Sequence, residues 1–245
     1  MNSNGGDLKQ SQRDFLIHLE SFLAKRDGVD KLLKISRYAA KIIVSSSVFP
    51  EALPLNHRLR SFEASVGLSR KAFRLGKFVQ DVNALRAREV SSREEFFLSI
   101  LSYGGEGLYY FVEQFVWLSK SGLIDKKHAQ SLGKVSAWAE LVGYFGSILL
   151  KIKEVQKLES DEFLLVSSIE AAIKMGKECI MEEEKLRKTR QKKSLKRLSV
   201  VQDVADGLMA LGDISSKGKL SSPLLLSCAG LLSALISTHK NWLSS

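Results

Sequence analysis

Prolines are scarce in this chain, and their scarcity limits its fold more than any other feature of the sequence. Only three occur among 245 residues, at positions 50, 54 and 223. Because proline removes a backbone donor and clashes with the preceding helical turn, the long segments between these positions are free to be helical. They are rich in Leu, Ala, Lys, Arg and Glu, which lose little side-chain freedom in a helix. The sequence therefore predicts an all-α fold.

An excess of Lys and Arg gives the chain a formal net charge of +10 at pH 7. Such a charge predicts an anionic partner, which can be nucleic acid or an acidic membrane surface. No nucleic-acid-binding motif is recognisable in the sequence. We therefore expect an anionic lipid membrane as the partner and no nucleic acid.

Signatures of catalysis are missing from the sequence. It contains no Walker A loop, no nucleophile elbow, no HExxH and no dinucleotide-binding glycine pattern. Cys179 and Cys228, with four scattered histidines, form neither a zinc-ligand spacing nor a disulfide framework. The sequence therefore predicts no enzyme, no catalytic residue, no metal and no cofactor. The run Gly104-Gly105-Glu106-Gly107 lacks the lysine of a phosphate loop, so we interpret it as a bend or a site of close helix packing.

Residues 1–57 are expected to form amphipathic N-terminal helices on the cytosolic side. Apolar residues recur at steps of three and four between Asp14 and Ser36, and Asp27-Gly28 interrupts them with a turn or cap signal. This pattern predicts two short helices, followed by a linker at residues 48–54 that holds two of the prolines. Charged residues interrupt the apolar positions of the first thirty residues, so no secretory signal is expected.

Residues 58–90 carry the pattern of a membrane-active amphipathic helix. Its strongest apolar periodicity steps 4, 3, 4, 3 along one helix face, and basic residues gather on the other side. The predicted lipid-inserting face consists of Leu68, Ala72, Leu75, Phe78, Val79 and Val82, and the predicted headgroup-binding residues are Arg70, Lys71, Arg74 and Lys77. Such a helix suits the boundary between lipid headgroups and acyl chains. An ordinary surface helix of a bundle fits the same periodicity.

Three later stretches are candidate membrane spans. Residues 220–238 contain no charge and approach the ~20 residues that a span requires, so we predict a transmembrane helix there, followed by the short tail 239–245. In the hydrophobic central region 91–151, the stretches 96–118 and 135–150 are marginal, because a carboxylate at mid-bilayer costs at least ~2.5 kcal/mol. The carboxylates are Glu106, Glu113 and Glu140. The sequence thus predicts one to three hydrophobic segments.

Residues 152–219 separate these spans and are strongly charged. The run Glu182-Glu183-Glu184 is followed by a basic block at residues 185–197. A charge block of this kind is typical of a solvated helix or linker, and less often of a lipid or protein docking site. We predict a charged helical region.

Three segments resemble one known family, that of peroxisomal membrane protein 11, and most closely its plant-type members. LAKRDGVDKLLKISRYAAK at residues 23–41 is similar to the family's N-terminal signature, and RLRSFEASVGLSRKAFRLGKF at 58–78 is similar to its membrane-active helix. VWLSKSGLID at 116–125 is similar to its central motif. The similarity runs over nearly the whole chain, although the C-terminus lacks the dilysine ending of some plant relatives.

This resemblance implies a function at the peroxisomal membrane. It implies an integral protein, single-pass or multi-pass, with its N-terminus in the cytosol, which elongates the membrane and promotes peroxisome proliferation and fission. The implied partners are further copies of the chain, other family members in hetero-oligomers, and the fission machinery, a dynamin-related protein and its adaptor. The alternative is a metabolite channel of the peroxisomal membrane, which would need Glu106, Glu113 or Glu140 to face water within the bilayer.

Overall fold

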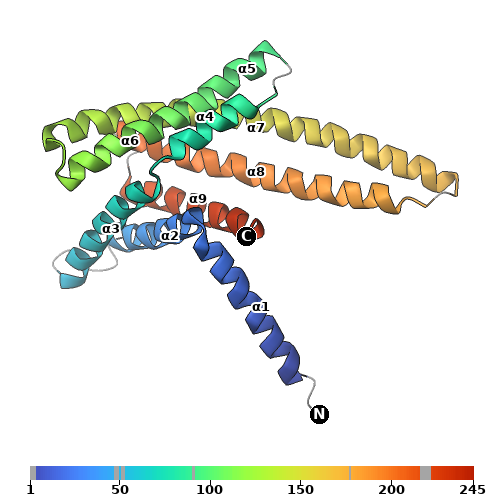
Figure 1. Ribbon diagram of the computed structural model, residues 1–245, viewed down its shortest axis with the longest axis horizontal. Coiled ribbons are helices and arrows are strands. Elements are labelled where there is room, and N and C mark those ends of the chain that lie inside the picture. The colour runs from blue at the N-terminus through green and yellow to red at the C-terminus, as the bar shows by residue number, and fades with distance from the viewer. Residues whose placement is uncertain (1–3, 47–49, 51–52, 90–91, 177, 216–221) are drawn as a thin grey trace.

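The chain folds into an all-helical structure in which an antiparallel pair of long helices forms the long axis (Figure 1). The computed structural model describes residues 4–46, 50, 53–89, 92–176, 178–215 and 222–245, and these contain no strand. The α-helices are α1 (Asn4–Ala24), α2 (Arg26–Ser45), α3 (Pro54–Phe73), α4 (Lys77–Ala87), α5 (Arg93–Ser99), α6 (Gly105–Ser121), α7 (Ala129–Lys174), α8 (Ile180–Ile214) and α9 (Pro223–Leu243). A π-helical turn, Ile100–Gly104, joins α5 to α6, and a 3-10 turn, Lys126–His128, precedes α7.

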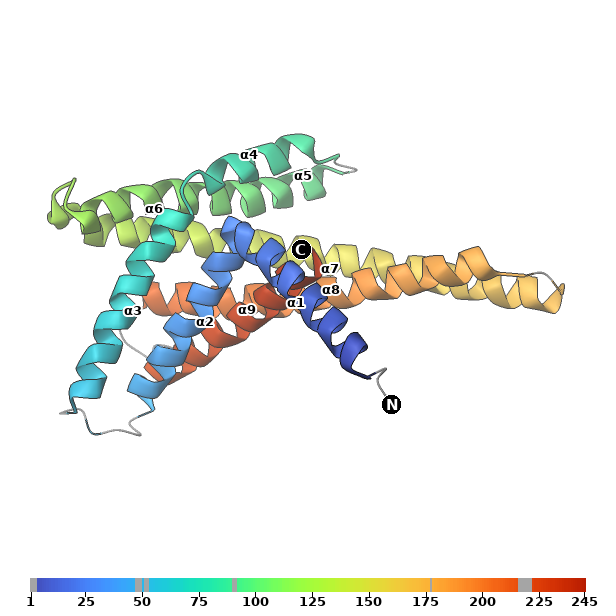
Figure 2. The ribbon, with the colours of Figure 1, turned by 60° about the horizontal axis from the view of Figure 1, so that its bottom comes forward.

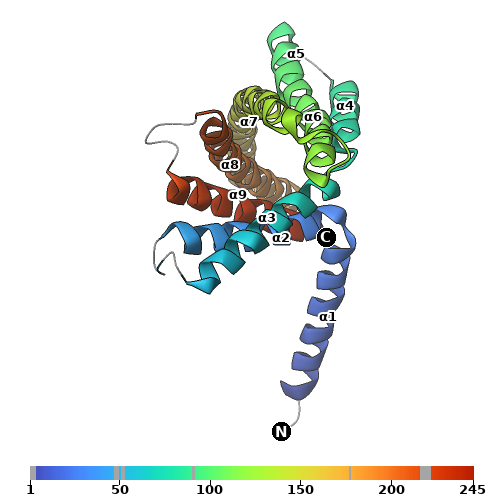
Figure 3. The same cartoon turned by 90° about the vertical axis from the view of Figure 1, so that its left-hand side faces the viewer.

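The other helices pack around one half of the α7–α8 pair. Figure 2 shows α4, α5 and α6 along one side of it, while α2, α3 and α9 form a second group. Helix α6 contacts α7, and α9 contacts both α8 and α2. Helix α1 projects away from this body (Figure 3). At its C-terminal end Phe15, His18 and Phe22 surround the Trp242 ring, with His18 at a centroid distance of 4.2 Å.

Local sequence signals account for several helix ends. Pro54 and Pro223 are the first residues of α3 and α9, where the missing N–H costs nothing because that position has no helical partner. The hydroxyl of Ser92 accepts a hydrogen bond of 3.1 Å from the backbone N–H of Glu95 and so caps α5. Two N-terminal helices are present as predicted, but the predicted break at Asp27-Gly28 is wrong, because the chain breaks at Lys25 and both residues belong to the first turn of α2.

The predicted amphipathic helix is not one helix. Helix α3 ends at Phe73 and α4 begins at Lys77. Between them Gly76 has a φ of 76°, a left-handed conformation that glycine adopts without steric cost. The expectation of a single uninterrupted helix over residues 58–88 is therefore wrong, because the glycine allows the chain to turn at the centre of the apolar stripe.

The distribution of side chains in this bundle is inverted relative to that of a water-soluble domain. The buried positions of α7 and α9 are mostly small residues, whereas many large apolar side chains are exposed. The buried small residues include Ser136, Ala137, Ala139, Gly143, Gly146, Ser147, Ser227, Ala229, Gly230, Ser233, Ala234 and Ser237. The exposed apolar residues include Leu108, Phe111, Phe115, Val135, Trp138, Val142, Phe145, Leu224, Leu225, Leu232 and Leu235. Small residues between helices with large apolar residues outside are typical of helices packed in lipid.

One helix among the described residues is long and apolar enough to cross a membrane, at residues 126–174. It contains the predicted marginal span 135–150, and 39% of its most apolar stretch is buried, so most of that stretch faces outward. Of the predicted span 220–238, residues 220 and 221 lie outside the described part of the chain. Most of the remainder lies in α9, which has 21 residues but is not, by length and composition together, among the described helices that could cross a membrane.

Candidate functional site: a buried charge network

The first two turns of α2 carry charged residues on the side that faces the rest of the bundle. Asp27, Asp30 and Lys34 follow one another at steps of three and four, which places them on one helix face. Asp30 is 1% exposed and Lys34 is 6% exposed. Charged groups buried to this degree are stable only with partners, so α2 must meet opposite charges on its neighbours.

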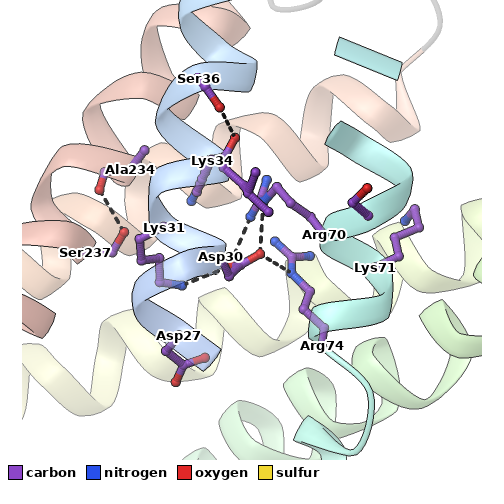
Figure 4. Close-up of polar contacts among 12 residues, drawn as sticks. Asp27, Asp30, Lys31, Lys34, Ser36, Arg70, Lys71, Arg74, Ala234 and Ser237 are labelled. Carbon is purple, nitrogen blue, oxygen red and sulfur yellow. Dashed lines mark hydrogen bonds and ion pairs between the residues drawn. The ribbon is translucent and has the colours of Figure 1, made fainter. Parts of the chain in front are cut away.

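Asp30 meets the arginines of α3. Arg70 donates from Nε to Oδ1 of Asp30 at 3.0 Å and from Nη2 to Oδ2 at 3.4 Å. Arg74 places its Nε 3.9 Å from the same carboxylate, and Figure 4 shows both guanidinium groups directed at Asp30. Burial by itself raises the pKa of Asp30, but the positive charges of Arg74 and Arg70 outweigh it and hold that pKa well below its usual range. Asp30 is therefore a fixed negative charge.

Glu113 of α6 binds the same stretch of α3 from the other side. Lys71 donates to Glu113 Oε1 at 2.6 Å, and Arg74 donates to Oε2 at 3.1 Å. The hydroxyl of Tyr109 donates to Oε1 at 3.1 Å and accepts from Arg74 at 2.5 Å. Burial lowers the pKa of Lys71, and the charge of Glu113 opposes this shift. Arg74 thus links α2 to α6 through two acids.

Lys34 extends the network to the C-terminal helices. Its ammonium group lies 2.8 Å from Oδ1 of Asp206 on α8 and 2.6 Å from Oγ of Ser233 on α9. Lys77, the first residue of α4, binds Asp27 at 2.6 Å. The network therefore connects α2 with α3, α4, α8 and α9, and through Glu113 with α6.

The four predicted headgroup-binding residues all lie in this network. Arg70 is 3% exposed and Lys77 is 8% exposed, and both Lys71 and Arg74 bind Glu113. In this arrangement their charges are neutralised by protein carboxylates. Their binding to lipid headgroups stays a prediction, and it would require these ion pairs to open.

The predicted lipid-inserting face divides at the helix break. On the α4 side Leu75, Val79 and Val82 are 57%, 46% and 49% exposed. Leu68, Ala72 and Phe78 are half-buried. The Phe78 ring packs against Phe111 of α6 at a centroid distance of 5.5 Å, and Phe111 packs against Phe115. The outward stripe of α4 therefore continues directly onto the apolar outer face of α6.

Close backbone contact joins α6 to α7. A Cβ atom on Gly105 would lie 2.6 Å from the backbone nitrogen of Gly143, so the two helices approach as near as their backbones permit. This confirms the prediction of close helix packing at the glycine run. Glycine at such a crossing is typical of helices that associate in lipid, where small residues allow dense contact.

The glutamates that a channel would need are engaged with protein groups. Glu113 belongs to the charge network, Glu106 accepts from the Tyr110 hydroxyl at 3.4 Å and Glu140 accepts from the Tyr144 hydroxyl at 3.1 Å. Within the part of the chain that the structure describes, no three His, Cys, Asp or Glu residues are grouped so that they could hold a metal ion. The channel alternative stays a prediction.

A helical bundle with its charges paired inside and its large apolar side chains outside belongs to the class of integral membrane proteins. The chain belongs to one family in this class, because the model of the peroxisomal biogenesis factor 11 family matches residues 16–242. It is 60% identical over 237 residues to peroxisomal membrane protein 11A of Arabidopsis thaliana, with 96% of each chain covered. It is 56% identical to peroxisomal membrane protein 11-3 of Oryza sativa subsp. japonica, covering 94% of this chain and 90% of the relative. No solved structure matches the chain.

Of the acids in the network, Asp27, Asp30 and Asp206 were not predicted as functional residues, and Glu113 was named only for the channel alternative. Asp30 falls within the segment 23–41 that resembles the family's N-terminal signature, and Asp27 was interpreted as a turn signal. The step of three between them places both on one face of α2. The sequence therefore offered one signal for the pairing, namely two acids on one face of α2 and basic residues at similar steps over 70–77. The signal could be used only with the knowledge that α2 and α3 lie side by side.

Proposed function

We propose that this protein resides in the peroxisomal membrane and remodels it, so that the organelle elongates before it divides. The names of its relatives, the peroxisomal membrane proteins 11A and 11-3, support the location. The observation that carries the proposal is the apolar outer face of α4, α6 and α7, whose large hydrophobic side chains would be exposed to water unless the surrounding lipid covers them.

The outward stripe of α4 is the proposed wedge. Val79 and Val82 are exposed on α4, a short helix that packs against α6, and the exposed Leu75 lies in the turn just before it. Insertion of these side chains among the acyl chains of one leaflet would expand that leaflet, and each Å² of apolar surface removed from water contributes ~25 cal/mol. Expansion of one leaflet relative to the other favours curvature.

The charge network gives the wedge a rigid support in this proposal. Lys77 at the start of α4 is bound to α2, and Arg74 just before it is bound to α2 and α6. A helix tied at its base to a membrane-embedded bundle transmits its displacement to that bundle, whereas a free amphipathic helix can withdraw. We therefore assign Arg70, Lys71, Arg74 and Lys77 an anchoring role in the closed state, and headgroup binding only after opening.

The partners follow from the resemblance to the family. We propose that copies of the chain associate with one another and with other family members, and that they help to recruit a dynamin-related protein and its adaptor. Local concentration of many wedges would increase the curvature that each one generates.

Replacement of Leu75 and Val79 by Glu tests the wedge. Two carboxylates on this stripe should oppose insertion because burial of charge in hydrocarbon is costly. We expect peroxisomes in cells that carry the double variant to remain round, while fluorescence microscopy still locates the protein at their membrane.

The matched control replaces Gln80 and Ala87 of the same helix by Glu. Both residues are exposed and lie outside the apolar stripe, so the control gains the same charge and should still elongate peroxisomes. Normal elongation by the Leu75 and Val79 variant would overturn the proposed wedge.

A further inference from the structure

A cavity of about 590 Å³ lies where α2, α3, α8 and α9 meet. We call it the junction cavity, and it is separate from the charge network because none of Asp30, Arg70, Arg74 and Glu113 lines it. Its volume falls within the ~300–1,000 Å³ of small-molecule sites.

One wall of the junction cavity is basic. Arg37 and Lys41 of α2 and Arg60 of α3 line it. Glu63 of α3 binds Arg37 at 2.7 Å and lies 3.6 Å from Lys41. Because Arg37 and Lys41 share a single carboxylate, this wall keeps an excess of positive charge that can bind a further anionic group.

An acid of α8 also lines the cavity. This acid is Asp213, and among the described residues it takes part in no hydrogen bond or ion pair. Burial raises the pKa of Asp213, and the positive charges of Lys41 and Arg37 oppose this shift, although neither cation lies within ion-pair distance of the carboxylate. The junction cavity therefore has cations on its α2 side and an acid on its α8 side that are not ion-paired with each other.

Apolar residues complete the lining at the start of α9. Pro223 and Leu226 belong to its first turn, and Val44 of α2 and Met209 of α8 lie near them. If α9 enters the bilayer from this end, its first turn lies at the depth of the headgroups. A ligand in the junction cavity would then have its polar part between the cations of α2 and the acid of α8, and its apolar part against these side chains.

We propose that the junction cavity binds the headgroup of a zwitterionic phospholipid, with its phosphate on the wall of Arg37 and Lys41 and its ammonium group on Asp213. This inference rests on the proposed membrane function, because it takes the ligand from the surrounding bilayer. A free phosphate would leave Asp213 and the apolar lining without a partner. A purely anionic headgroup would bring a negative charge beside Asp213, which is unfavourable at short range.

Short-chain lipids test the proposal on the full chain purified in a non-ionic detergent. Dihexanoyl-phosphatidylethanolamine should bind in native mass spectrometry more tightly than dihexanoyl-phosphatidylglycerol, and inorganic phosphate should not compete. Lys41→Met should weaken this binding by about tenfold, the effect of losing one charge-assisted hydrogen bond. Lys41→Arg should restore it.

Asp213→Asn provides the sharper variant because it changes selectivity rather than affinity alone. It should still bind phosphatidylglycerol, and its preference for phosphatidylethanolamine should disappear. Lys127→Met is the matched control, since Lys127 is 69% exposed on the turn before α7 and does not line the cavity. It should bind like the unmodified chain.

Three results would overturn the proposal. They are equal binding of both lipids by the unmodified chain, displacement of the lipid by inorganic phosphate, and an unchanged preference in Asp213→Asn. Because binding is measured in detergent, such a failure leaves the proposed wedge intact. Conversely, failure of the wedge variant to alter peroxisome shape leaves the lipid site to be judged on these measurements.

Discussion

The two halves of α7 lie in different environments although they form one continuous helix. Residues 129–150 contain two charged residues, whereas 151–174 contain nine. In the first half Trp138 and Phe145 point outward, and the residues packed against α6 are small. In the second half Glu162 binds Arg190 of α8 at 2.8 Å and also Lys193, and Glu159 binds Arg197. From this difference in charge we propose that the first half faces lipid and the second faces water.

The length of α7 agrees with this division. Its 46 residues extend about 69 Å at 1.5 Å per residue, roughly twice the ~30 Å hydrocarbon thickness of a bilayer. The second half, with α8, therefore forms an arm that protrudes beyond the other helices (Figure 1). The mean apolarity of a helix therefore does not by itself define a membrane span. Its outward face must also be apolar over the hydrocarbon thickness of the bilayer.

The largest effect is expected from Asp30→Asn in the buried charge network. The change leaves Arg70 buried without its carboxylate, which typically costs about 3–5 kcal/mol. We expect the variant to lose most of its thermal stability in detergent, measured as the temperature at which it aggregates. Asp161→Asn on the exposed side of the arm is the control and should behave normally. Equal stability of both variants would show that the network is not needed for the fold.

A smaller effect is expected from lysine substitutions of the two exposed phenylalanines of α7. Phe145 is 61% exposed and Phe163 is 72% exposed, so they differ mainly in the half of the helix that carries them. Lysine near the centre of a bilayer costs about 2.5–3.5 kcal/mol on insertion scales. Phe145→Lys should therefore reduce the fraction that resists alkaline carbonate extraction, and Phe163→Lys should not. The same loss from both substitutions would remove the distinction between the halves.

The smallest effect is expected from Glu159→Gln on the arm, where the side chains of Glu159 and its partner Arg197 are 44% and 59% exposed. Exposed ion pairs contribute about 0–1 kcal/mol and are screened by salt. The variant should unfold within a few degrees of the unmodified chain, and this small difference should shrink in 1 M salt. A loss as large as that of Asp30→Asn would mean that the arm is desolvated, contrary to its assignment.

The helical fold was predictable because it depends on local properties. Scarce proline and a three- to four-residue apolar period indicate helices wherever they occur. The two N-terminal helices and the close packing at the glycine run were found in this way. The break at Gly76 was not, since a single glycine inside a periodic segment is compatible with a continuous helix and with a turn.

The candidate site was predictable only on its basic side. Arg70, Arg74 and Lys77 were identified from their periodicity, but their partners Asp27, Asp30 and Glu113 come from other helices. Periodicity locates a residue on its own helix and does not reveal which helix packs against it. The stretch 135–150 was considered marginal on account of Glu140, and the partner that the fold gives this carboxylate, the Tyr144 hydroxyl, was likewise not deduced from the sequence.

Water accessibility of the two phenylalanine positions measures directly whether the apolar outer face of the bundle lies in lipid. Phe145→Cys and Phe163→Cys would each be introduced into a chain whose Cys179 and Cys228 are replaced by Ser, and opened membranes would be treated with a water-soluble maleimide that cannot enter lipid. We expect rapid labelling at position 163 and labelling at position 145 only after detergent is added. Equal labelling at both positions before detergent would contradict this expectation, because the apolar outer face of the bundle would then lie in water.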